Sequence, residues 1–219
     1  MERINRDVVI PEMIEHVNKN ILPQYDTFDK GHQQDHIKNV WENCKLIIKN
    51  NHLKVDINMI YVISHYHDLG LIINREDHHL NSAKIMENDE VIKKYFMTDE
   101  IHVMSEAIKD HRASNNYLPR TIYGKIIADG DRQINLEKII SRIIAYNKPL
   151  SPELNRNELF NQKIYTHFCE KYGCNGSPGY LELSFKHSQA QKDLEEISKV
   201  SEEEVFKIYC KYYDMKANK

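Results

Sequence analysis

Histidine and aspartate residues recur in order along the first two-thirds of the chain. They are His36, the adjacent pair His67-Asp68, His78, His111 and Asp131. Imidazole and carboxylate groups hold Mn, Fe, Zn or Mg in proteins, and an adjacent His-Asp pair can supply two ligands from one short segment. The types and order of these residues predict a site for divalent metal ions.

Helices are the elements that must position these side chains. Glycine and proline are scarce, at 7 and 6 of 219 residues, and alternating strand patterns are rare. Apolar residues instead recur at steps of three and four, which is typical of one face of an α-helix. The spacing predicts helices over residues 33–49, from 57 to a stop at Gly70, from 78 past Met86, over 99–112, from 122 to Asp129, and over 136–146, 155–171 and 189–213.

The candidate ligands belong to different predicted helices, and several lie on the apolar face. His111, for example, is in phase with Met104 and Ile108. Buried His and Asp side chains are costly unless they are paired or bound to metal. Helical bundles assemble metal sites from side chains that project inward from facing helices. We therefore expect an all-α fold whose core holds the ligands.

The tract from Pro149 to Pro152 interrupts the helical pattern and predicts a boundary. Residues 1–148 would form a metal-binding helical domain, and residues 149–219 a C-terminal helical extension packed on its core. No recurring ligand set occurs in that extension.

Each piece of the ligand pattern is weak evidence by itself. A chain with 12 histidines should contain about one His-Asp dipeptide by chance. A single His in phase with apolar residues is more often a hydrogen-bonded core residue than a ligand. The joint occurrence, in order and on separate helices, favours the metal site.

Five segments resemble the HD-domain superfamily of metal-dependent phosphohydrolases, and they cover roughly residues 25–135. Gly31 to Val40 (GHQQDHIKNV) is similar to the family's early helix, and Ser64 to Gly70 (SHYHDLG) to its His-Asp segment. The later matches are His78 to Ala83 (HHLNSA), Ala107 to Arg112 (AIKDHR) and Gly124 to Arg132 (GKIIADGDR). As an ordered set they are specific, and the resemblance implies the family's helical bundle.

The resemblance also implies one or two divalent ions, of Mn, Fe, Mg or Zn. His36, His67, Asp68 and a late aspartate would hold the first ion. His78 and His111 would hold a second, with Asp68 bridging.

Two ligand positions have alternatives. The late aspartate is Asp131 or Asp129; both follow a small residue, and Asp131 is favoured because a basic residue comes next. His78 is favoured over His79 because it lies four residues before Ser82-Ala83.

Hydrolysis of a small phosphate ester, such as a nucleotide, is the activity that the resemblance implies. Asp68 would orient a metal-activated water. Phosphate also favours a guanidinium fork, for which Arg112, next to a ligand, is the leading candidate, ahead of Arg75 and Arg132. Two other functions stay open: a di-iron oxygenase on the same fold, and a non-catalytic metal-binding regulatory protein.

The composition argues against several other classes of protein. The net charge is −3, and basic residues are scattered among acidic ones, so a nucleic-acid module is not expected. The longest apolar runs, such as Met59 to Ile63, are too short to cross a bilayer. The N-terminal stretch has no signal-peptide pattern. We expect a cytoplasmic protein, with a homodimer as the default assembly.

Overall fold

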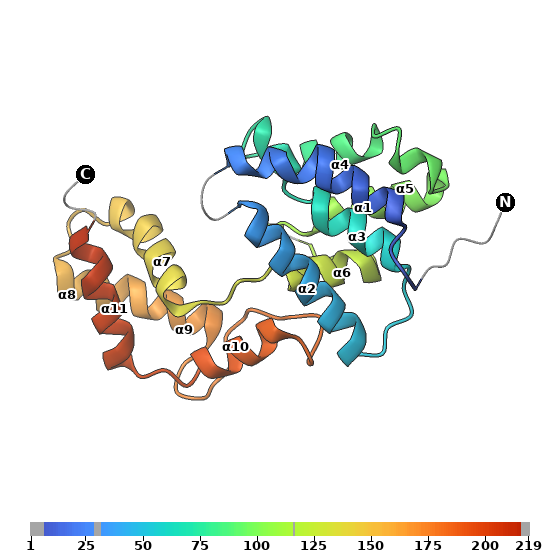
Figure 1. Ribbon diagram of the computed structural model, residues 1–219. Helices are drawn as coiled ribbons and strands as arrows, with labels where there is room; N and C mark the ends of the chain where they lie inside the picture. The colour runs from blue at the N-terminus through green and yellow to red at the C-terminus, as the bar shows by residue number, and fades with distance from the viewer. Residues whose placement is uncertain (1–6, 29–31, 116, 216–219) are drawn as a thin grey trace. The chain divides into compact units, whose positions relative to one another are not determined.

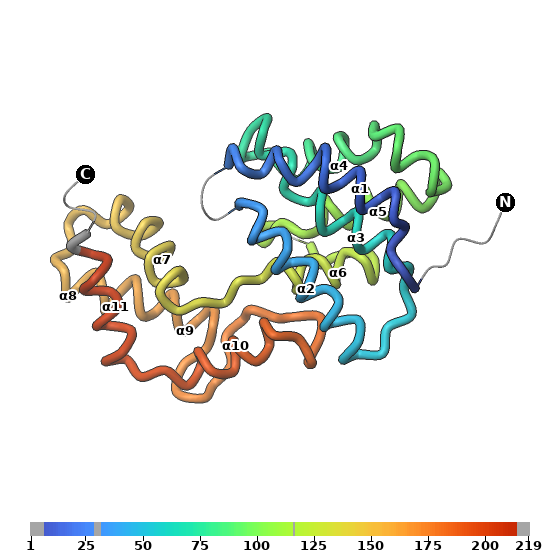
Figure 2. The backbone as a smooth tube through the Cα atoms, in the orientation of Figure 1, coloured from blue at the N-terminus to red at the C-terminus, as the bar shows by residue number. Residues whose placement is uncertain are grey.

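The computed structural model describes residues 7–28, 32–115 and 117–215, with side chains to Tyr213. Gly31, the first residue of the early family-like segment, lies outside these ranges. Within them helices are joined by turns and loops, and no β-strand forms, as Figures 1 and 2 show. The predicted all-α class is confirmed. None of the helices in these ranges is long and apolar enough to span a membrane.

Most of the predicted helices begin and end close to their predicted positions. The labelled helices are α1 (Pro11–His16), α2 (Gln34–Asn50), α3 (Ile57–Tyr66), α4 (His78–Glu87), α5 (Thr98–Asp110), α6 (Ile122–Gly130), α7 (Leu136–Leu150), α8 (Arg156–Leu159), α9 (Tyr165–Tyr172), α10 (Gln189–Ile197) and α11 (Glu202–Met215). Side-chain caps set two of the starts. Asp56 accepts the amide of Asn58 at the start of α3, and Thr121 accepts the amide of Gly124 at the start of α6.

The chain divides into two compact units after Arg132, and not between residues 148 and 149 as the proline pattern predicted. Unit 1 comprises Met1–Arg132 and Ser184–Ser188, and unit 2 comprises the rest. Pro149 lies in the last turn of α7, where it removes one backbone hydrogen bond shortly before the helix ends. Because α7 packs against α9 and α11, it belongs to unit 2.

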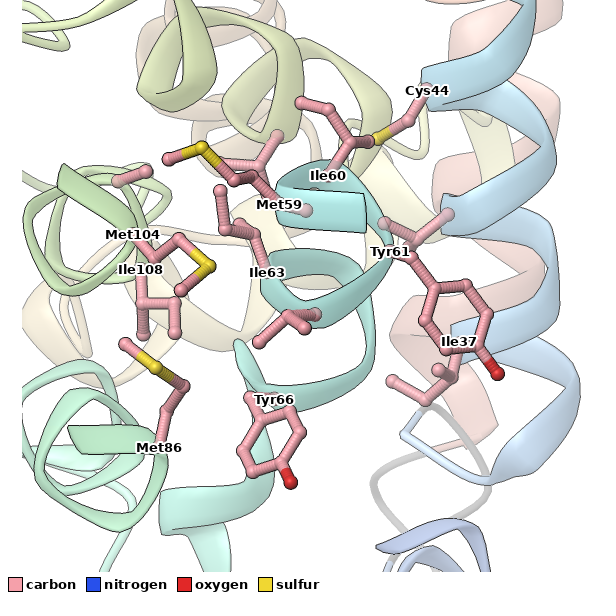
Figure 3. Close-up of a cluster of buried hydrophobic side chains, with 14 of the residues drawn as sticks. Ile37, Cys44, Met59, Ile60, Tyr61, Ile63, Tyr66, Met86, Met104 and Ile108 are labelled. Atoms are coloured by element: carbon pink, nitrogen blue, oxygen red, sulfur yellow. The ribbon is translucent and has the colours of Figure 1, made fainter. Parts of the chain in front are cut away.

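The core of unit 1 surrounds α3. Figure 3 shows Ile60 and Ile63 of α3 with Ile37 of α2 on one side and Met104 and Ile108 of α5 on the other. Every residue of α3 from Asn58 to Tyr66 is buried. A helix enclosed on all sides carries its end into the interior, and the end of α3 leads directly into His67-Asp68.

An N-terminal helical segment, which the sequence did not predict, covers part of this core. It consists of α1, a π-helical stretch Val17–Ile21 and a 3₁₀ helix Leu22–Thr27. Met13, Val17 and Tyr25 of this segment are fully buried.

Unit 2 has a hydrophobic core of its own, built from α7, the stretch from α8 to α9, and α11. The helix predicted over residues 189–213 is two helices, α10 and α11. Ser198 donates its hydroxyl to the carbonyl of Glu195, and Ser201 accepts the amide of Glu204. Serine hydroxyls compete for backbone groups in this way and favour a helix break, which apolar periodicity does not reveal.

Candidate metal centre

The six predicted ligands lie together in unit 1, and each stands at the end of a helix. His36 is in the first turn of α2, and His78 is the first residue of α4. The others lie at C-terminal ends: His67-Asp68 after α3, His111 after α5 and Asp131 after α6. The partial negative charge of a helix C-terminus favours a cation, and three such ends meet here.

Asp68 lies between two pairs of histidine nitrogens. Its Oδ2 atom is 3.4 Å from Nε2 of His36 and 3.4 Å from Nε2 of His67. Its Oδ1 atom is 3.5 Å from Nε2 of His78 and 3.4 Å from Nε2 of His111. The two oxygens of one carboxylate therefore face different histidine pairs, which is what a carboxylate bridging two cations requires.

Asp131 completes the set on the Oδ2 side. Its Oδ1 atom is 3.2 Å from Nε2 of His36 and 3.7 Å from Nε2 of His67. On the Oδ1 side, the Nε2 atoms of His78 and His111 are 3.2 Å apart. Two ligand atoms that each lie about 2.1 Å from one ion stand roughly 3.0–3.4 Å from each other. The observed spacings are close to these values, so the residues present could hold metal ions.

Backbone carbonyls fix the orientation of three of the four histidine rings. Nδ1 of His67 lies 2.9 Å from the carbonyl oxygen of Ser64, and Nδ1 of His78 lies 2.8 Å from that of Arg75. Nδ1 of His111 lies 2.5 Å from the carbonyl of Ile108. A carbonyl only accepts, so each Nδ1 carries a proton, and in the neutral ring the lone pair on Nε2 faces the centre. Metal-binding histidines usually have such a partner on the second nitrogen.

His67 shows most directly how the charges of the cluster act on one buried side chain. Its side chain is fully buried, and its Nε2 atom makes no hydrogen bond of good geometry. Burial alone would lower the pKa of His67, but Asp68 and Asp131 hold it well above its usual range. The histidines in turn hold the pKa values of Asp68 and Asp131 below theirs, against the effect of burial. Two ionised carboxylates, buried Asp68 and partly exposed Asp131, thus attract positive charge, whether protons or metal ions.

Solvent reaches the centre at two ligands. The side chains of Asp131 and His78 are 26% and 16% exposed, whereas those of His36, His67, Asp68 and His111 are 8% exposed or less. A small molecule would therefore enter beside Asp131 or His78.

The structure places His78, and not His79, in the cluster. Adjacent helical residues point about 100° apart, so only one of the two can face Asp68. His79 is buried beside Arg112, with its Nδ1 atom 3.5 Å from the guanidinium. Burial and the charge of Arg112 lower the pKa of His79 to about 4.

The structure likewise places Asp131, and not Asp129, in the cluster. Asp129 is buried and accepts the amide of Phe185 at 2.9 Å and that of Ser184. Burial raises its pKa despite these bonds. Its function is therefore different: it fastens the Ser184–Ser188 segment to the end of α6, two residues before Asp131.

Arg112, the expected phosphate-binding arginine, contacts the start of α4. Its Nη1 atom donates to the carbonyl of Glu76 at 2.7 Å. This contact lies two residues before His78. Binding of phosphate by Arg112 stays a prediction. Arg132, the residue after Asp131, has a buried Nε atom with no hydrogen-bond partner among the described residues.

Two residues near the centre, which the sequence did not predict as part of the site, hold its backbone. Gly70 donates its amide to Ser82 at 2.8 Å and thereby ties the turn after Asp68 to α4. Tyr25 donates its hydroxyl to the carbonyl of His65 from 40 residues away. Neither is a ligand type, and both act on backbone groups, so only the folded chain reveals them.

Comparisons of the chain with family models, with curated proteins and with solved structures find no match.

Proposed function

We propose that this chain is a metal-dependent phosphohydrolase that acts on a small phosphate ester, such as a nucleotide. The observation that carries the proposal is the position of Asp68, whose two oxygens face separate histidine pairs at 3.4–3.5 Å. A bridging carboxylate of this kind is suited to a pair of divalent ions. Bound there, such ions would lower the pKa of a water molecule and polarise a phosphoryl group.

The side chains of the centre supply binding and orientation. Asp68 would accept a hydrogen bond from the attacking water or bridge the ions beside it, which fixes the direction of attack. The buried rings of His67 and His111, held through Nδ1, keep their Nε2 lone pairs aimed at fixed points. Such preorganisation costs no rearrangement during the reaction.

Bound metal ions would give this centre a positive charge that favours an anionic substrate. The chain as a whole carries −3, so it has no general attraction for phosphate. Two divalent ions set against the two carboxylates would leave a local charge of about +2. A phosphate ester entering beside Asp131 or His78 would meet that charge.

The partial exposure of Asp131 and His78 supports catalysis over a purely structural metal. A structural site closes all coordination positions with protein ligands, whereas a catalytic site keeps a position for water or substrate. Here the protein offers three ligands on the Oδ1 side of Asp68 and four on the Oδ2 side, fewer than the six positions of an octahedral ion, and solvent reaches both sides.

The test measures metal content and turnover together. Purified protein is assayed for Mn, Fe, Zn and Mg per chain, and then for hydrolysis of a phosphodiester to its monoester and of a nucleotide panel with each metal added. We expect close to two ions per chain and metal-stimulated hydrolysis. Oxygen consumption by an iron-loaded protein without hydrolysis of a phosphate ester would instead identify an oxygenase. Metal binding without turnover of any kind would point to a regulatory protein.

Paired aspartate variants locate the activity. Asp68→Ala should abolish turnover and metal binding, because it removes the shared ligand. Asp35→Ala, at a side chain that is 96% exposed and next to His36 in the sequence, is the matched control and should change neither. Turnover that survives Asp68→Ala with the helical circular dichroism signal intact would refute the proposal.

A further inference from the structure

The backbone has to leave α3 between the ligands His67 and Asp68. The amide of His67 still donates to the carbonyl of Ile63 at 3.0 Å, as in a helix. In a continuing helix the carbonyl of Ser64 would accept the amide of Asp68. It accepts Nδ1–H of His67 instead, at 2.9 Å. Asp68 turns out of the helix with φ −106° and ψ 0°, so its amide needs another acceptor.

One hydroxyl group holds the backbone beside this turn. Tyr25 donates its hydroxyl to the carbonyl oxygen of His65 at 2.8 Å, two residues before His67, and the amide of Asp68 lies near its phenolic oxygen. The side chain of Tyr25 is fully buried. The Leu22–Thr27 helix that carries it packs against the turn Leu69–Ile72, which follows Asp68 directly.

We propose that Tyr25 is a positioning residue of the metal centre: it holds the backbone at Asp68 so that the two carboxylate oxygens face the two histidine pairs. This inference rests on the proposed metal centre, and not on the reaction that occurs there. Tyr25 acts through Asp68 and is not itself a ligand.

The geometry explains why the backbone must be held here. A short aspartate side chain offers only two rotatable bonds, so the position of its Cα largely decides where the carboxylate can reach. Bridging requires both oxygens to be placed at once, and small displacements weaken both contacts. Removal of the Tyr25 hydroxyl would leave the buried carbonyl of His65 without this donor, and the turn would relax.

Tyr209 supplies a matched comparison within the same chain. It is also a fully buried tyrosine, and its hydroxyl donates to the carbonyl of Arg156 at 2.9 Å. Tyr209 belongs to unit 2, which contains no predicted ligand. If Tyr25 were only a core residue, the two tyrosines would respond alike to removal of the hydroxyl.

The experiment compares Co²⁺ binding by wild type, Tyr25→Phe and Tyr209→Phe in the full chain. Calorimetry gives the affinity and stoichiometry, and the visible absorption of bound Co²⁺ reports its coordination. We expect Tyr25→Phe to weaken Co²⁺ binding about 10- to 100-fold, the usual effect of losing a group that orients a ligand. At saturating Co²⁺ its spectrum should differ from wild type, whereas Tyr209→Phe should match wild type in both measurements.

Three results would overturn the inference. The first is a Tyr25→Phe protein with wild-type Co²⁺ affinity and spectrum. The second is an equal loss in Tyr209→Phe. The third result concerns wild type and is needed if Tyr25→Phe does not fold. Hydrogen exchange on metal-free wild type should show that the Asp68 amide is protected. An unprotected Asp68 amide would refute the inference that Tyr25 holds the backbone there. Wild type that binds no Co²⁺ refutes the metal centre as well. Co²⁺ binding without phosphatase activity refutes the hydrolase alone.

Discussion

Gly70 and His78 lie so close together that a Cβ atom on Gly70 would stand 2.1 Å from the carbonyl oxygen of His78. It would also meet the amide nitrogen of Ser82 at 2.5 Å. Both contacts are with backbone, which cannot rotate away. The absence of a side chain at position 70 therefore lets the start of α4 reach Asp68, and with it the ring of His78.

Gly70→Ala should move α4 away from Asp68. We expect a loss of about 1–3 kcal/mol of unfolding free energy, as for other substitutions that overfill a packed interior. The ion on the Oδ1 side of Asp68 should be lost first, because His78 moves with α4. Urea unfolding and metal titration measure the two effects. Gly176→Ala, where no atom lies within 4 Å of the added Cβ, is the control. It should cost about 1 kcal/mol from its positive φ and leave metal binding unchanged.

The two histidine pairs predict separable binding steps. A His78→Ala, His111→Ala double variant should keep His36, His67, Asp68 and Asp131 and bind one ion per chain. His36→Ala should weaken the other ion and spare the pair on the Oδ1 side. Metal content after dialysis gives the stoichiometry directly. A double variant that still binds two ions would show that the second ion lies elsewhere.

Asp129 should act on stability through the Ser184–Ser188 segment. Asp129→Ala leaves the buried amide of Phe185 without its acceptor, at a cost of about 1–3 kcal/mol. Asp129→Asn keeps one oxygen acceptor and should cost less. Hydrogen exchange at the Phe185 amide checks the assignment: exchange should accelerate in the alanine variant. Unchanged exchange would mean that Phe185 packing alone holds the segment.

Asp89 should make stability depend on acid pH. Burial would raise its pKa, but hydrogen bonds from Tyr66, His16 and the amide of Val91 hold it below its usual value. A carboxylate whose pKa is lower in the folded state stabilises the fold at pH values above its unfolded-state pKa of about 3.9. This contribution is lost as the pH falls through the pKa of the folded state. Wild type should therefore lose stability more steeply than Asp89→Asn below about pH 4. Urea midpoints from pH 7 to pH 2.5 give the difference, and parallel curves would contradict the prediction.

The all-α class and most helix positions follow from the sequence because apolar periodicity is a local property. The convergence of the ligand types was also predictable, since buried imidazoles and carboxylates need partners. The predicted helix bounds also placed His36 and His78 at helix starts, but they ran too far to place His67-Asp68 and His111 beyond the ends of α3 and α5. His111 looked like a member of an apolar stripe, yet it is the residue that follows α5. Periodicity cannot tell the last residue of a stripe from the first one beyond it.

Long-range contacts account for the remaining differences. The choice between Asp131 and Asp129 depends on where residues 184–188 lie, and nothing near position 129 signals that. Tyr25 reaches the backbone of His65 and Asp68 from a segment with no ligand in it. The prolines near position 149 suggested a boundary, but packing of α7 with α9 and α11 decides which unit that helix joins.

Residues Ser184–Ser188 belong to unit 1, although they lie between two stretches of unit 2 in the sequence. This order has a consequence for the gene as well as for the protein. A reading frame ended after Arg132 would encode all six predicted metal ligands but not Phe185. The amide of Phe185 donates a hydrogen bond to Asp129, and its ring lies in the core of unit 1. No single cut yields both units whole. One crossover after Arg132 would therefore separate Asp129 from its partner Phe185.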